Sequence, residues 1–111
     1  MLAQSPLAVA FPDAYPISPG HLLVVPRRHE PAFFALSPDE QAQMLLLATE
    51  LHGRLAAELG FDGVNLGVNC GEVAGQTVHH AHLHFVPRYR GDVTEPAGGI
   101  RWILPDKARY W

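Results

Sequence analysis

With 111 residues, the chain is long enough for one domain with a hydrophobic core and too short for two. Its hydrophobic content of 48% and charged content of 17% are typical of a globular protein and exclude a disordered chain. The net charge of −3 leaves no basic tract that could grip a nucleic-acid backbone, so we expect no nucleic-acid partner.

The first predicted strands lie in residues 7–26. Leu7–Phe11 is a short apolar run that ends at Pro12, and we interpret it as a strand. Residues 14–20 are rich in turn-forming residues, and His21–Pro26 predicts a second strand, because proline cannot donate to a strand ladder. The two strands predict an antiparallel hairpin with a wide loop, and Pro31–Ala35 predicts a helical turn.

The strongest local signal is a helix from Ser37 to Leu59. Ser37 is a good N-cap, Pro38 suits the first helical position, and Glu40 completes a capping box. Gly60 fits the position just past the end of the helix. The apolar residues expected to face the core recur at the spacing of a helix, and they are Met44, Ala48, Leu51, Leu55 and Leu59.

Leu45, Leu46 and Leu47 give this helix an apolar surface wider than one stripe, because three consecutive residues span about 200° of the circumference. A thick core within one chain would explain this width, and so would a partner. We expect a symmetric homodimer, in which Gly53 would let a second backbone approach closely.

Residues 63–111 complete the predicted domain. Gly63–Asn69 alternates apolar and small or polar residues, as a strand with one apolar face does. A glycine-containing loop (70–75) and a histidine-rich strand ended by Pro87 follow, and Ile100–Leu104 predicts a short strand within a tail rich in Pro and Gly. The pattern predicts a single domain over 1–111 of the α+β class, with one long helix packed on an antiparallel sheet.

The histidine-rich strand carries His80, His82 and His84 at a spacing of two. Side chains alternate between the faces of a strand, so the three imidazoles are expected to project from one side. The opposite, core-facing row would consist of Ala81, Leu83 and Phe85.

The expected subcellular localisation follows from features that the sequence lacks. Cys70 is the one cysteine, which excludes an internal disulfide framework and a Cys-rich zinc site and is typical of a reducing compartment. No apolar run approaches the ~18–20 residues that cross a bilayer, and the N-terminus lacks the pattern of a signal peptide. We therefore expect a cytoplasmic protein with no membrane partner.

The histidine row admits three interpretations. The imidazoles could be solvated surface groups, or ligands of zinc or another transition metal with His21 as a further ligand. They could instead provide a nucleophile that attacks phosphorus, since a neutral histidine attacks and then leaves readily near pH 7. Gln76 and Thr77, with the backbone amides beside them, lie just upstream and are suited to hold a phosphate.

Residues 80–86 read His-Ala-His-Leu-His-Phe-Val, which is a complete histidine-triad motif. The chain resembles the histidine triad (HIT) family here, and also at residues 75–78 and 87–88 around the motif. The resemblance extends upstream over residues 11–13, 18–26 and 69–75 and covers roughly residues 7–90, with a C-terminal tail over 91–111.

The resemblance implies a HIT-like fold and a nucleotide hydrolase or transferase that forms a covalent nucleotidyl-histidine intermediate. His82 would attack the α-phosphate, the carbonyl of His80 would orient His82, and His84 and His21 would join the cluster. By the same resemblance, the base would contact Phe11 and Leu23, the ribose Asp13, and the phosphate or leaving group Asn69, Gln76 and Thr77.

No metal or cofactor is implied by the resemblance, although Mg²⁺ could shape a polyphosphate substrate. The sequence after Arg88, with Gly91, Asp92 and a long tail, is similar to bacterial and fragile-histidine-triad members, which cleave dinucleoside polyphosphates or similar nucleotide conjugates. We therefore expect that substrate class, with purine nucleotides favoured. The alternatives are a Hint-type nucleoside phosphoramidase and a nucleotide-binding protein with little turnover.

Overall fold

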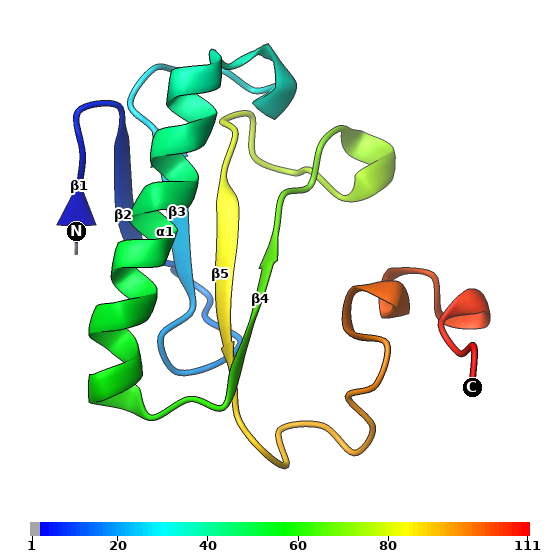
Figure 1. Cartoon of the computed structure of the whole chain (residues 1–111). Coiled ribbons are helices and arrows are strands. Elements are labelled where there is room, and N and C mark those ends of the chain that lie inside the picture. The colour runs from blue at the N-terminus through cyan, green and yellow to red at the C-terminus, as the bar shows by residue number, and fades with distance from the viewer. Residues whose placement is uncertain (1–2) are drawn as a thin grey trace.

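The computed structural model describes residues 3–111 and has the expected α+β architecture, with one antiparallel sheet covered on one face by one long helix (Figure 1). The order of the strands across the sheet is β1-β2-β3-β5-β4. Their bounds are Ala3–Gln4 for β1, Ala8–Pro12 for β2, Leu22–Pro26 for β3, Gly63–Gly67 for β4 and Leu83–Arg88 for β5.

The predicted antiparallel hairpin is confirmed as β2 paired with β3, with Phe11 opposite Leu23. Its first strand was predicted one residue too early, since β2 begins at Ala8. The short edge strand β1, which pairs with β2, was not predicted, because two residues carry no periodicity. The predicted helical turn at Pro31–Ala35 is confirmed as the 3₁₀ turn η1 (Phe33–Ala35).

Helix α1 (Pro38–Leu59) confirms the predicted capping and end. The Ser37 hydroxyl accepts from the backbone N–H of Glu40 at 3.0 Å, and the Glu40 carboxylate accepts from the Ser37 N–H at 2.9 Å. Gly60 ends the helix in the left-handed conformation, with φ of 64°. The buried apolar residues that face the sheet are Met44, Leu47, Ala48 and Leu51. Leu55 is half-buried and Leu59 is exposed, so burial of the predicted core-facing residues decreases towards the C-terminal end of the helix.

The histidine strand was predicted to begin near His80, but β5 begins at Leu83. Pairing of β3 with β5 stops at Val24 and Leu83, and continuing this register would place Pro26 opposite Ala81. Pro26 cannot donate to the ladder, and the N–H of Ala81 instead donates to the carbonyl of Glu30 at 2.7 Å. The strand runs one residue past the predicted stop at Pro87, where β4 still pairs with it.

The strand Gly63–Asn69 is two residues shorter than predicted, since β4 ends at Gly67. The predicted strand at Ile100–Leu104 is wrong, because Gly99–Ile103 forms the 3₁₀ helix η3 and Pro105–Lys107 forms η4. The tail lies beyond β4, away from α1 (Figure 1). Within residues 3–111, no helix has the length and apolar character needed to cross a membrane.

Candidate active site

The two faces of the sheet differ in kind. Ala10, Leu22, Val24, Leu83 and Phe85 are buried on the face that α1 covers, and the expected core-facing row from Ala81 to Phe85 is confirmed. The opposite face carries a row of directly paired residues that crosses four strands, and the row consists of Phe11, Leu23, His84 and Gly67.

A cavity of about 960 Å³ lies over this row, and we call it the histidine cavity. Eight of the ten residues predicted for the site line it, and these are Phe11, Asp13, His21, Leu23, Asn69, Thr77, His82 and His84. They come from β2, β3, β5 and the loops after β2 and β4. The topology therefore gathers residues that lie up to 73 positions apart in the chain.

His82 is held in one tautomer. Its Nδ1 lies 2.8 Å from the carbonyl oxygen of His80, as the resemblance implied. A carbonyl oxygen can only accept, so Nδ1 carries the proton and Nε2 keeps its lone pair. The ring is half-buried and lines the cavity. A neutral His82 therefore has one nitrogen available as a nucleophile or a base.

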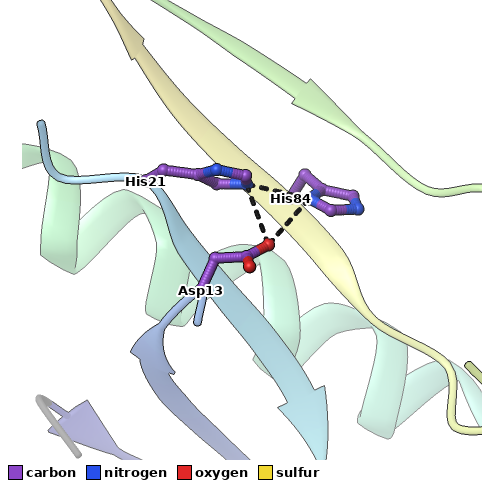
Figure 2. Close-up of side chains that lie close together, drawn as sticks. All are labelled: Asp13, His21 and His84. Atoms are coloured by element: carbon purple, nitrogen blue, oxygen red, sulfur yellow. Dashed lines mark hydrogen bonds and ion pairs between the residues drawn. The ribbon is translucent and has the colours of Figure 1, made fainter. Parts of the chain in front are cut away.

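His21 and His84 are also ordered, through a chain of hydrogen bonds that begins at the backbone of Ile17. Figure 2 shows the contact between the two imidazoles. The N–H of Ile17 donates to Nδ1 of the buried His21 at 3.2 Å, so Nε2 of neutral His21 carries the proton. That Nε2 lies 3.0 Å from Nδ1 of His84, which must then accept. The proton of neutral His84 consequently resides on Nε2, where it can be donated to a ligand.

Asp13 lies against this histidine pair (Figure 2). Its Oδ2 is 3.4 Å from Nε2 of His21 and 4.0 Å from Nδ1 of His84, while its Oδ1 accepts from the N–H of Tyr15 at 2.8 Å. Partial burial lowers the pKa of His84, and so do the neighbouring His82 and His21, whereas Asp13 opposes the shift. The result favours neutral His84 near pH 7, as the hydrogen-bond chain requires.

The same three side chains could hold a metal, since one ligand atom from each lies within 4.8 Å of the others. Coordination by Nε2 of His21 would require the proton on that atom to leave. The imidazole would then either become an imidazolate anion or carry its proton on Nδ1, which faces the Ile17 N–H. The backbone donor therefore favours a chain of hydrogen bonds here over metal ligation.

Two predicted site residues lie outside the lining of the histidine cavity. His80 directs its Nε2 to the carbonyl oxygen of Pro26 at 3.0 Å, so this ring joins the loop before β5 to the end of β3. Gln76, expected to contact phosphate, instead orders its own loop. Its amide donates to the carbonyls of Pro31 and Val78 at 2.7 and 3.1 Å, and its oxygen accepts from the N–H of Gly71 at 2.9 Å.

Several lining residues were not predicted from the sequence. Tyr15 and Ile17 come from the wide loop of the hairpin, where their side chains are largely exposed. Ile100 and Ile103 come from η3 in the tail. An apolar residue within a Pro-rich loop carries no periodic signal, so only the folded chain reveals these positions.

Comparison with known proteins agrees with this geometry. An uncharacterized HIT-like protein of Methanocaldococcus jannaschii is 42% identical over 84 residues, which are 76% of this chain and 64% of that protein. An Arabidopsis thaliana protein named bifunctional bis(5'-adenosyl)-triphosphatase/adenylylsulfatase is 38% identical over 88 residues, or 79% of this chain and 49% of that protein. The chain thus spans between about half and two thirds of these relatives.

Among solved structures, a HIT family protein from Bacillus anthracis superposes with a TM-score of 0.77 at 36% identity, covering 82% of this chain and 64% of that one. A histidine triad family protein from Mycobacterium smegmatis, described as zinc-bound, gives a TM-score of 0.75 at 35% identity, covering 84% and 68% of the two chains. The HIT domain profile matches residues 1–91. This chain therefore belongs to the HIT domain family.

Proposed function

We propose that the chain is a nucleotide hydrolase that cleaves dinucleoside polyphosphates at the α-phosphate through an adduct on His82. The observation that carries the proposal is the 2.8 Å contact between Nδ1 of His82 and the carbonyl of His80, which leaves the Nε2 lone pair free in the cavity. The names of relatives supply the substrate class: besides the Arabidopsis protein, a Schizosaccharomyces pombe relative is named bis(5'-nucleosyl)-tetraphosphatase.

In the first step, the Nε2 lone pair of His82 forms a bond to the α-phosphorus. The bond from phosphorus to the bridging oxygen breaks, and its electron pair leaves with the departing nucleotide. The adduct is an imidazolium whose Nδ1–H remains hydrogen-bonded to the His80 carbonyl, which stabilises the positive charge. The Nε2–H of His84 is the donor positioned for the oxygens on which negative charge develops.

In the second step, water attacks the same phosphorus. The nitrogen–phosphorus bond breaks, its electron pair returns to Nε2 of His82, and a nucleoside monophosphate is released. The proton lost by the water goes to solvent or to the product phosphate. His82 thereby regains its neutral tautomer, ready for another cycle.

The cavity offers groups for the rest of the nucleotide. Phe11 and Leu23 provide apolar contacts for a purine base, and the carboxylate of Asp13 is suited to accept from ribose hydroxyls. Asn69 and Thr77 lie on the loop side of the cavity, where they could contact the phosphate or the leaving group. Gln76 would act indirectly, by fixing the shape of the loop that carries Thr77.

The proposed chemistry needs no metal ion, since the nucleophile and the proton donor are both imidazoles. Exhaustive chelation should leave the reaction at His82 intact, and Mg²⁺ would alter only the shape of a polyphosphate substrate. Stoichiometric zinc in the purified protein, with activity restored by zinc alone, would contradict this part of the proposal.

A steady-state panel with product analysis tests the function. It should contain a dinucleoside triphosphate, a dinucleoside tetraphosphate, an adenylyl sulfate and a nucleoside phosphoramidate. We expect the dinucleotides to have the highest kcat/KM, with a nucleoside monophosphate among the products. Preference for the phosphoramidate would indicate a Hint-type enzyme, and tight binding without turnover would indicate a binding protein.

We also propose that the chain forms a two-fold homodimer through the outer face of α1. Leu45 and Leu46 are 50% and 66% exposed there. A Cβ added to Gly53, two turns after Leu46, would meet no described atom within 4 Å. Light scattering at micromolar concentration should give a dimer mass, and Leu46→Glu should give a monomer. A monomeric wild-type protein would contradict the proposal.

A further inference from the structure

All but the first residue of the C-terminal tail (91–111) lies outside the stretch that the HIT profile matches, which ends at residue 91. It nevertheless contributes Ile100 and Ile103 to the lining of the histidine cavity. These side chains are 57% and 78% exposed, so they are poorly explained as core packing. A segment that adds apolar surface to a cavity without filling a core is suited to contact a ligand.

The first residues of the tail are fixed to the sheet by Arg88. Its guanidinium donates to Oδ1 of Asn65 on β4 at 2.7 Å and to both carboxylate oxygens of Asp92 at 2.7 and 2.9 Å. These bonds with Arg88 help to lower the pKa of Asp92 to about 2, so the ion pair persists throughout the physiological range. The entry to the tail is therefore attached to β4.

The rest of the tail is held together by contacts between its own residues, from Glu95 to Trp111. Both carboxylate oxygens of Glu95 accept from the guanidinium of Arg109, and one also accepts from the indole N–H of Trp111 at 3.2 Å. The Arg109 guanidinium lies 5.5 Å from the ring centre of Trp102 and 5.7 Å from that of Trp111. Trp102 belongs to η3, so these contacts restrain the helix that carries the two isoleucines.

The cavity extends to both sides of His84 across the sheet. Phe11 and Leu23 lie on the β2–β3 side of His84, and Gly67 is its direct neighbour on the β4 side. A Cβ at Gly67 would meet no described atom within 4 Å, so this side is open. The tail borders it, because a Cβ at Gly99 would lie 3.6 Å from Nδ2 of Asn65.

We propose that Ile100 and Ile103 form an apolar subsite for the leaving nucleoside of a dinucleoside polyphosphate. The inference rests on the proposed function, in which the transferred nucleoside occupies the Phe11–Leu23 side and His82 attacks its phosphate. The polyphosphate then extends past the histidines to the β4 side, where the second base contacts the isoleucines. A ligand with one nucleoside has nothing to place in this subsite.

The test compares the binding of two ligands by calorimetry. One is a dinucleoside tetraphosphate with methylene-bridged phosphates, which cannot be cleaved, and the other is AMP. Ile100→Ser combined with Ile103→Ser should raise the Kd of the dinucleotide about tenfold and change the Kd of AMP by less than about twofold. Leu104→Ser is the matched control, because Leu104 is 65% exposed in the same segment and is not among the lining residues.

The outcomes separate the subsite from the catalytic proposal. The subsite proposal would be overturned if the Kd of both ligands rose equally or if neither Kd changed. It would also be overturned if Leu104→Ser weakened dinucleotide binding as much as the double variant does. Binding does not depend on turnover, so these results stand whatever the substrate panel shows. Conversely, a wild-type protein that binds the dinucleotide through the isoleucines but cleaves none of the panel would contradict the proposed hydrolase and leave the subsite in place.

Discussion

His84 and Phe85 are neighbours in the chain but serve opposite faces of the sheet. Phe85 is 1% exposed and packs in the core that α1 covers, whereas His84 lines the histidine cavity and bonds to His21. On the Phe85 face, residues are selected by volume and shape. On the His84 face, the arrangement is set by which atom donates a hydrogen bond and which accepts it. Truncating a side chain to alanine should therefore affect mainly stability on the Phe85 face and mainly activity on the His84 face.

The largest effect should come from removing the nucleophile. His82→Ala should lower kcat by about 10⁴-fold or more, while the Kd for nucleotide and the free energy of unfolding change little, because the side chain acts mainly in the transition state. His84→Ala should cost less, since it removes a donor and leaves the nucleophile. Near-normal turnover by His82→Ala, measured at saturating substrate, would contradict the mechanism.

The opposite face should show the reverse pattern. Phe85→Ala should lower the free energy of unfolding by about 3–5 kcal/mol, because it leaves a cavity between the sheet and α1. His84→Ala, one residue earlier, should cost much less stability, since its ring is only partly buried. Urea denaturation of the two variants measures both effects. Equal losses of stability in the two variants would contradict the claim that the Phe85 face serves core packing and the His84 face serves the active site.

A smaller effect should follow from removing the donor that orders the histidine pair. Ile17→Pro deletes the N–H that bonds to Nδ1 of His21, and Ile17→Ala is the control, because it shortens the side chain but keeps the donor. We expect a loss of about tenfold in kcat/KM in the proline variant relative to the alanine variant. Nitrogen NMR of the imidazoles should show one tautomer of His21 in the control and a mixture in Ile17→Pro. A single tautomer in both would refute the role of the backbone donor.

The smallest effect concerns pH. The lowered pKa of His84 means that the unfolded chain takes up a proton before the folded one does as the pH falls through about 6.5. The contribution of His84 to stability is therefore fully present above this range and is lost as the pH decreases. Denaturation between about pH 5.5 and 7.5 should show stability rising with pH, with a shallower slope in His84→Gln. An unchanged slope in the variant would assign the dependence to another group.

The features predicted correctly from the sequence depend on neighbours along the chain. The capping box of Ser37 and Glu40 spans three residues, and the alternation from Ala81 to Phe85 follows from the geometry of an extended backbone. The family motif adds the identity of the site, so that eight of the ten residues named for it line one cavity. Local chemistry and a specific motif thus suffice for the fold class and for naming eight residues that the fold brings to one cavity.

The features that the sequence did not reveal depend on distant partners. Gln76 bonds to the carbonyl of a residue 45 positions away, and His80 to one 54 positions away, so neither side chain lines the cavity. Ile17 acts on His21 through its backbone N–H, which every residue except proline possesses. The tail was predicted to contain a strand, but ion pairing and ring contacts within it fix a 3₁₀ helix beside the cavity instead.

Rapid quenching of the wild-type protein with a dinucleoside polyphosphate tests the central claim most directly. Digestion and peptide mapping should locate a nucleotidyl group on His82, in an acid-labile linkage that is stable in base, as a bond between phosphorus and an imidazole nitrogen is. The same treatment of His82→Ala should yield no adduct. An adduct on another residue, or steady turnover with no adduct on His82 at any quench time, would contradict the account.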